Sequence, residues 1–177
     1  MPPARETPRG STRRAPAVLL MLAAALLVAR IGTGIWEQRG APEPADRMQW
    51  RPIANAEAES RASGRPVLYE FSAAWCGPCN RMAAEVFADP ASAGRLGSMF
   101  VPVHVVDRGR EDGRNPPEVQ ALQDRFHIDA FPTLVVCDPA TGRHETITGY
   151  GGRTVMMREL MQARAKLHAA VGARDSS

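Results

Sequence analysis

Cys76 and Cys79 are two of the chain's three cysteines and stand three residues apart, with Gly77 and Pro78 between them. Glycine and proline suit a tight turn into a helix, since the first helical N–H groups have no partner inside the helix. Cys76 is therefore predicted to lie at a helix N-terminus, where unpaired N–H groups and the positive end of the helix dipole favour a thiolate. We expect Cys76 to be the acidic, exposed nucleophile and Cys79 to be the shielded, resolving thiol. Sulfurs at this spacing can also form a disulfide, so the pair predicts thiol–disulfide exchange.

Three other kinds of site use closely spaced cysteines. A zinc site needs four ligands, whereas the third cysteine, Cys137, and the histidines are scattered singly along the chain. A haem attachment site needs His after the second cysteine, and Asn80 stands there. A purely structural disulfide stays open, although so short a loop constrains the unfolded chain very little. We expect no metal and no organic cofactor, with the cysteine pair itself as the redox group.

A strand is predicted to lead into the cysteine pair. Residues 67–71 place Val, Tyr and Phe on one side and Leu and Glu on the other, and this alternation is typical of a strand. Further strands are predicted over 100–106, 133–137 and 143–148, and helices over 52–63, from 77 to about 88, over 118–127 and over 154–170. This order of strands and helices, which closes with a hairpin and a helix, predicts an α/β fold whose sheet is covered by helices on both faces.

Two further residues of chemical interest lie in these strands. His104 is expected to be a packed or partly exposed strand residue rather than a catalytic base. Cys137 ends an apolar run that begins at Leu134. It is expected to be a buried, inert thiol, with a regulatory or intermolecular role as the alternative.

The motif Trp75-Cys76-Gly77-Pro78-Cys79 after a hydrophobic strand, with Phe131-Pro132-Thr133 opening a later strand, resembles the thioredoxin family. The resemblance covers about residues 50–170 and implies a thioredoxin fold, a three-layer α/β/α arrangement with a central mixed sheet. In its lead-in from Trp50, the chain is most similar to the extracytoplasmic thioredoxin-like domains. These include the C-terminal domain of the bacterial transmembrane thiol:disulfide interchange protein. The resemblance makes Trp75, Gly77 and Pro78 supporting residues of the active site.

The resemblance also gives Glu70 a role. Family members often carry an acid six residues before the first cysteine, beneath the disulfide, where it helps to take the proton from the resolving thiol. Glu70 occupies that position, although thioredoxins proper commonly have the shorter Asp. A buried carboxylate in an apolar strand is costly unless it has such a task. A solvent-facing strand residue is the alternative.

The segment from Phe131 to Thr133 matches the family's cis-proline loop. The match implies a cis peptide bond before Pro132. It also implies that the backbone of Phe131, beside the disulfide, accepts an extended client segment by strand addition, with Thr133 completing the substrate-binding segment.

The N-terminal part of the chain indicates export. Residues 1–16 are a basic leader that we expect to stay in the cytoplasm, and 17–36 are an apolar segment preceding the fold, either a signal anchor or a cleaved signal peptide. We favour the anchor, because the end of the apolar run, 27–29, has a bulky leucine where cleavage wants a small residue. Residues 37–49 are a polar linker, 50–170 the thioredoxin-like domain and 171–177 a flexible tail. The domain is thus expected on the extracytoplasmic, periplasmic side of the inner membrane.

The composition excludes one class of partner and the motifs suggest others. The net charge of +3 does not indicate nucleic-acid binding, because the arginines are spread along the chain and four belong to the leader. Gly77-Pro78 between the cysteines resembles the reducing family members, so we expect a monomeric reductase of disulfides in exported proteins, itself re-reduced by a membrane electron donor. The alternatives are a disulfide oxidase or isomerase, or a non-catalytic binding module.

Overall fold

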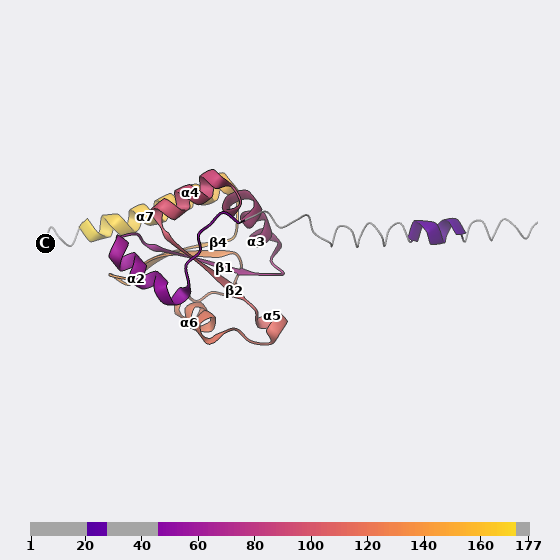
Figure 1. Cartoon of the computed structure of the whole chain (residues 1–177), viewed down its shortest axis with the longest axis horizontal. Coiled ribbons are helices and arrows are strands. Elements are labelled where there is room, and N and C mark those ends of the chain that lie inside the picture. The colour runs from indigo at the N-terminus through magenta and orange to yellow at the C-terminus, as the bar shows by residue number, and fades with distance from the viewer. Residues whose placement is uncertain (1–20, 28–45, 173–177) are drawn as a thin grey trace, which may run out of the picture. The chain divides into compact units, whose positions relative to one another are not determined.

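The computed structural model describes residues 21–27 and 46–172 (Figure 1). Residues 21–27 are helical and belong to a unit, Met1–Glu43, separate from the unit Pro44–Ser177 that holds the cysteine pair. Among the described helices, none combines the length and the apolar character that crossing a membrane requires. The predicted leader 1–16, most of the apolar segment 17–36, the linker up to residue 45 and the end of the tail lie outside the described residues.

The domain alternates helices with four strands. In chain order the elements are α2 (Ile53–Ser63), β1 (Val67–Ala73), α3 (Gly77–Met82), the π-helical turn η1 (Ala83–Phe87), α4 (Pro90–Met99), β2 (Val101–Asp107), α5 (Gly109–Asp112), α6 (Pro117–Phe126), β3 (Thr133–Asp138), β4 (Arg143–Thr148) and α7 (Arg153–Gly172). The four predicted strands are present, and the predicted helices correspond to α2, α3 with η1, α6 and α7.

The sheet has the strand order β2-β1-β3-β4 and is mixed, as predicted. β1 runs parallel to β2, with Val67 opposite Val101, and antiparallel to β3, with Val67 opposite Cys137. β3 and β4 form the closing antiparallel hairpin. All seven residues of β1 are buried, because this strand is central and both of its faces are covered.

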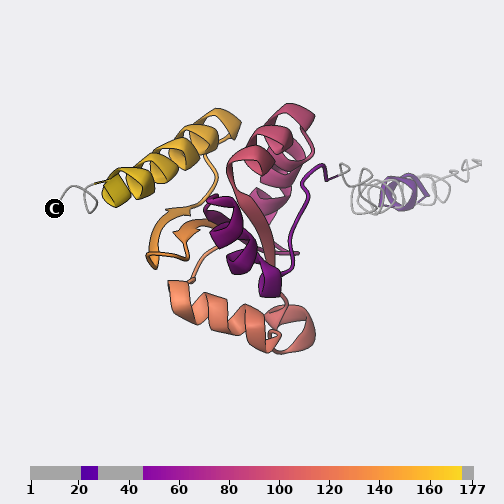
Figure 2. The same cartoon turned by 60° about the vertical axis from the view of Figure 1, so that its left-hand side comes forward.

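Helices cover both faces of the sheet, so the predicted three-layer arrangement is confirmed. In Figures 1 and 2, α4 and α7 lie on one side of the sheet and α6 lies on the other. The first side buries Leu68, Met82, Leu96, Leu134 and Leu160, which join the sheet to α3, α4 and α7.

The second side of the sheet packs mainly against α2 and α6. Its buried residues include Ala56, Tyr69, Leu122, Phe126 and Val135. Since successive strand residues point to opposite faces, Tyr69 belongs to this second side, whereas Glu70 shares the first side with α3, the helix that carries the cysteines.

The helix α4 was not predicted from the sequence. The helix that begins at residue 77 was expected to end at about residue 88, with the strand over 100–106 as the next element, but Asp89-Pro90 begins a new helix between them. Asp89 is the N-cap of α4, its side chain accepts a 2.8 Å hydrogen bond from the Ser92 N–H, and Pro90 opens the first turn. An acidic cap followed by proline is a helix-start signal, so the signal for α4 was present in the sequence.

Candidate active site

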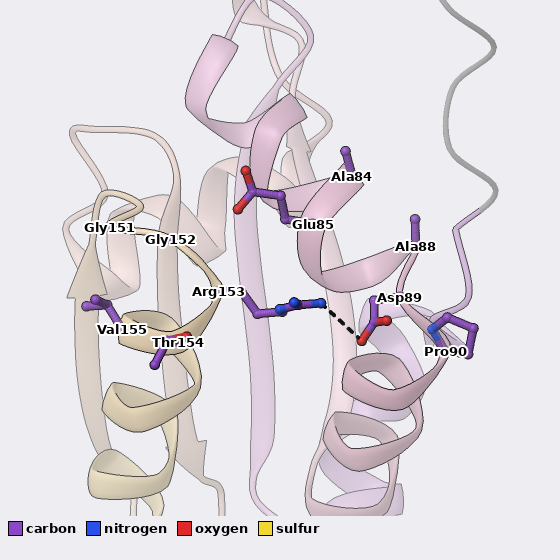
Figure 3. A pocket seen from close by; sticks show the side chains of 10 residues that line it. All are labelled: Ala84, Glu85, Ala88, Asp89, Pro90, Gly151, Gly152, Arg153, Thr154 and Val155. Atoms are coloured by element: carbon purple, nitrogen blue, oxygen red, sulfur yellow. Dashed lines mark ion pairs between the residues drawn. The ribbon is translucent and has the colours of Figure 1, made fainter.

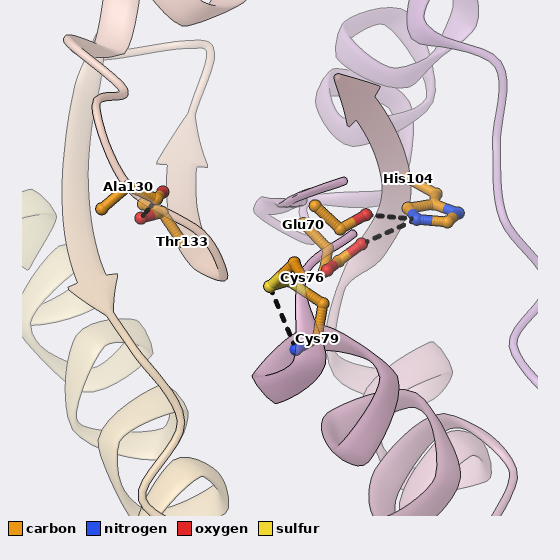
Figure 4. The surroundings of a disulfide bond; sticks show 7 residues. Glu70, Cys76, Cys79, His104, Ala130 and Thr133 are labelled. Carbon is orange, nitrogen blue, oxygen red and sulfur yellow. Dashed lines mark hydrogen bonds and ion pairs between the residues drawn. A yellow bond between two sulfur atoms is a disulfide. The ribbon is translucent and has the colours of Figure 1, made fainter. Parts of the chain in front are cut away.

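Cys76 and Cys79 form a disulfide at the start of α3. Cys76 is the N-cap with an extended backbone, and its sulfur accepts a 3.2 Å hydrogen bond from the Cys79 N–H (Figure 4). Pro78 lies in the first turn of the helix, where backbone N–H groups have no partner inside the helix, so its missing N–H removes no hydrogen bond. The predicted position of Cys76 at a helix N-terminus is therefore confirmed. There, backbone N–H groups can stabilise a thiolate once the disulfide is reduced.

The expected exposure of Cys76 is wrong for this oxidised form. Cys76 is only 3% exposed, which is no more than the 5% of Cys79. The reason is tertiary, since Phe131 packs against the buried cluster of Ala73, Cys76 and Cys79. Access to the sulfur of Cys76 therefore depends on the residues that pack around it.

Trp75 and Phe131 form the apolar part of that surface. Trp75 is 48% exposed, and its ring meets the ring of Phe131 edge to face at 5.8 Å between centroids. The guanidinium of Arg110, from α5, lies 4.6 Å from the centroid of the Trp75 ring, which is cation–π distance. Arg110 was not predicted to belong to the site, because it lies in a polar segment that only the fold brings near Trp75.

The peptide bond between Phe131 and Pro132 is cis. The segment is held by two hydrogen bonds, one from the Thr133 hydroxyl to the Ala130 carbonyl at 2.8 Å, shown in Figure 4, and one from the Gly149 N–H to the Pro132 carbonyl at 2.8 Å. The structure thus places Phe131 against the cysteine pair, and hydrogen bonds to Ala130 and Gly149 hold Thr133 and Pro132 beside it in the chain.

Glu70 is a buried carboxylate on the same side of the sheet as α3. It is 2% exposed, so the alternative of a solvent-facing residue is wrong. Figure 4 shows its carboxylate between the disulfide and the ring of His104. Oε2 of Glu70 lies 3.0 Å from Nε2 of His104, and the hydroxyl of Ser72 lies 2.8 Å from the same nitrogen.

His104 is a partly exposed strand residue, as the sequence predicted, with 39% of its side chain accessible. Partial burial by itself lowers the pKa of His104, but the hydrogen bond and charge of Glu70, together with the charge of Asp46, outweigh it and raise the pKa above 6.5. Its contact with Glu70 was not predicted, because the contact depends on the register that places Glu70 opposite His104 in the parallel strand pair.

Cys137 is a free thiol buried in β3 with no exposed surface. Burial raises its pKa to about 11, so almost none of it is thiolate near neutral pH. Because the thiolate is the reactive form, the expected inert character of Cys137 agrees with its environment.

A polar cluster at the end of β2 holds the segment that carries Arg110. The Asp107 carboxylate accepts hydrogen bonds from Gln123 at 2.8 Å, from Asn115 at 2.6 Å and from the Gly109 N–H at 3.0 Å. Burial raises the pKa of Asp107, but these three hydrogen bonds outweigh burial and hold the pKa below its usual value of 3.8. The cluster ties both ends of the segment to α6.

Replacing Asp107 by asparagine should destabilise the domain at neutral pH by about 1–3 kcal/mol, because in either orientation the amide nitrogen would face at least one of the N–H donors that now bond the carboxylate. A depressed folded pKa stabilises the native state above the unfolded pKa, and this contribution is lost as the pH falls through the folded pKa. The difference in free energy of unfolding between wild type and Asp107→Asn, measured by urea denaturation, should therefore be constant from pH 7 to about 5. It should become smaller below about pH 4. A difference in free energy of unfolding that is unchanged at acidic pH would contradict a stabilising role of the ionised Asp107 carboxylate.

A surface hollow of about 610 Å³ lies between η1 and the start of α7 (Figure 3). Arg153 faces Asp89 across it at 3.7 Å, and Glu85, on its rim, accepts a 2.6 Å hydrogen bond from Tyr150. Neither cysteine lines it, so it is separate from the disulfide. Within residues 21–27 and 46–172, no group of three or more His, Cys, Asp or Glu side chains is placed to hold a metal ion.

Comparison with known proteins agrees with this geometry. A model of the thioredoxin-like domain family matches residues 53–164. A thioredoxin of Mycobacterium bovis is 32% identical over 99 residues, which cover 56% of this chain and 74% of that protein. The protein disulfide-isomerase erp38 of Neurospora crassa is 37% identical over 92 residues, 51% of this chain. The matched part is 22% of that isomerase's length.

The same fold is found in a solved structure of the kind of domain that the lead-in sequence resembles. The C-terminal domain of DsbD from Neisseria meningitidis, in its oxidised form, superposes with a TM-score of 0.51 at 23% identity, covering 62% of this chain and 90% of that domain. At this identity the likeness concerns the fold alone. Together with the family match, it confirms the resemblance drawn from the two motifs.

Proposed function

This chain belongs to the thioredoxin-like family and is a thiol–disulfide oxidoreductase, and we propose that it works as a reductase of disulfides in exported proteins. The observation that carries the proposal is the Cys76–Cys79 disulfide at the start of α3, with the buried carboxylate of Glu70 beneath it. A helix N-terminus favours the attacking thiolate and a neighbouring base can activate the second thiol.

The proposed reaction has two steps. In the reduced protein, the Cys76 thiolate attacks a client disulfide, which releases one client thiolate and leaves Cys76 joined to the other client sulfur. Glu70 then takes the proton of Cys79, and the Cys79 thiolate attacks the sulfur of Cys76. The second client sulfur leaves as a thiolate, and the Cys76–Cys79 disulfide holds the oxidising equivalents. The pair itself is the redox group, so this reaction uses no metal and no organic cofactor.

The client is proposed to bind along the segment 131–133. Strand addition needs free backbone groups beside the reacting sulfur, and Phe131 contacts the cysteine cluster. Trp75 supplies exposed apolar surface on the same side, whereas Gly77 and Pro78 shape the turn between the cysteines. These contacts support the roles that the motif implied for 75–79 and 131–133.

The direction of electron flow is tested by the redox potential of the cysteine pair. Potentials of Cys-x-x-Cys proteins extend from about −270 mV for thioredoxin to about −120 mV for strong oxidants, a range of about 7 kcal/mol for two electrons. Because the intervening Gly77-Pro78 resembles the reducing members, equilibration of the pair with glutathione buffers should give a value near the reducing end. A value near the oxidising end would overturn the reductase proposal and favour the oxidase or isomerase.

The proposed location and partners follow from the N-terminal sequence. A basic leader followed by an apolar segment supports export with the domain on the periplasmic side, tethered to the inner membrane. There, a reductase needs a source of electrons, and we propose a membrane electron donor that reduces the Cys76–Cys79 disulfide between turnovers. We further propose that the protein acts as a monomer.

A further inference from the structure

Glu70 lies too deep to exchange its proton directly with bulk water. The residue is 2% exposed and lies on the central strand of the sheet, beneath α3. A base that accepts a proton from Cys79 in every turnover must also pass that proton on before it can act again. The proposed reaction therefore needs a second group that reaches both Glu70 and solvent.

His104 meets both requirements. Its Nε2 lies 3.0 Å from Oε2 of Glu70, and 39% of its side chain is accessible to solvent. It is held there by the hydroxyl of Ser72, 2.8 Å from Nε2, and by the ring of Trp50, whose centroid lies 5.2 Å from that of the imidazole. In Figure 4 the disulfide, the Glu70 carboxylate and the His104 ring follow one another from α3 to the outer edge of the sheet.

We propose that His104 is the outer end of a proton path that runs from Cys79 through Glu70 to solvent, and that its charge controls the resolving step. This inference rests on the proposed function, since it concerns the second half of the same exchange. Histidine is suited to the task because its charge changes between pH 5 and 8.

The proton balance is as follows. Cys79 starts as a thiol, Glu70 as a carboxylate and His104 as a neutral imidazole with its proton on Nδ1, so that the Nε2 lone pair accepts a hydrogen bond from the Ser72 hydroxyl. The Cys79 proton moves to Glu70, the Cys79 thiolate displaces the client thiolate from Cys76, and the sulfur–sulfur bond to the client is replaced by the Cys76–Cys79 bond. Glu70 then gives the proton to Nε2 of His104, the imidazolium returns its Nδ1 proton to water, and exchange of the ring protons with water restores the starting tautomer. The client receives the electron pair of the broken bond, and every residue except the two cysteines ends as it began.

The pH dependence follows from the charges that face His104. Two charged residues face His104, Glu70 from β1 and Asp46 from the segment before α2. The other two neighbours, Ser72 and Trp50, are neutral. A protonated His104 holds the Glu70 carboxylate in an ion pair, with Nε2 3.0 Å from Oε2, and it has no free lone pair to receive a proton. Resolution should therefore be slow below the pKa of His104 and should accelerate as the pH rises through it.

The two steps can be separated with 5,5′-dithiobis(2-nitrobenzoate) in a stopped-flow experiment on the reduced full chain. The first phase of thionitrobenzoate release reports the attack of Cys76 and the second reports resolution by Cys79. We expect the rate of the second phase to rise with an inflection above pH 6.5, at the same pH at which the ring of His104 titrates by NMR. In His104→Gln the inflection should disappear, and in His104→Lys, which keeps a fixed positive charge, the second phase should be about tenfold slower than in His104→Gln at pH 8.

The first phase and a matched variant serve as controls. A variant that fails to fold would lose both phases, whereas the inference concerns only the second. His144→Gln replaces another histidine of the same sheet, which packs on Phe126 on the opposite face, and it should keep the wild-type profile. A wild-type inflection that survives in His104→Gln overturns the inference and leaves the reductase proposal standing. Absence of a second phase in the wild type overturns both.

Discussion

Replacing Cys76 by serine is expected to reduce the rate of insulin reduction to that of the uncatalysed reaction with the same reductant. A serine hydroxyl in place of the thiol cannot form a sulfur–sulfur bond with a client, and the remaining thiols cannot take over its role. Cys79 lies further inside α3, and Cys137 is fully buried with its pKa raised to about 11. The effect is measured as the rate at which turbidity develops when insulin is reduced in the presence of a thiol, with wild type and variant at equal concentration.

Cys79→Ser is the matched variant, because it keeps the attacking sulfur and removes only the resolving one. It should also lose turnover, but it should accumulate a mixed disulfide between Cys76 and the client, visible as a covalent adduct on a non-reducing gel. Cys76→Ser should give no adduct. The client captured by Cys79→Ser can be identified by mass spectrometry. If wild type does not reduce insulin at all, and neither variant changes that, the domain is a binding module and not a reductase.

Replacing Glu70 by glutamine is expected to slow the resolving step about 10²-fold, at the lower end of what positioned proton transfer contributes. Glutamine keeps the shape of the side chain but cannot accept the Cys79 proton. The first step does not use Glu70, so mixed disulfide should accumulate during turnover. Rapid acid quenching, followed by separation of reduced, mixed and oxidised protein, measures the fraction in each form.

Stability measurements separate this chemical effect from misfolding. A buried carboxylate is costly to the fold, so Glu70→Gln should unfold at a urea concentration no lower than that of wild type. The control His144→Gln, which changes a residue on the opposite face of the sheet, should retain the wild-type resolving rate. A resolving rate in Glu70→Gln equal to that of wild type would show that the carboxylate is not the base.

The chemistry of this protein could be predicted from local sequence. Gly77-Pro78 predicts a helix N-terminus at the cysteine pair, and the spacing of the cysteines predicts a disulfide between them. Both predictions concern residues that are close along the chain, so they depend little on the tertiary fold. The strands were predictable for a related reason, since alternation of side chains is also local. The missed α4 was local as well, and its cap residues could have been interpreted as a start.

The surroundings of the disulfide were decided only by the tertiary structure. Glu70 meets His104 because β1 and β2 pair in parallel in one register, and a shift of one residue would have turned the histidine to the other face. Phe131 buries Cys76, and Arg110 reaches Trp75, through contacts between segments far apart in the chain. The sequence alone therefore predicted which two sulfurs form the disulfide. Packing decided how accessible they are and which charges surround them, because both depend on residues that only folding brings together.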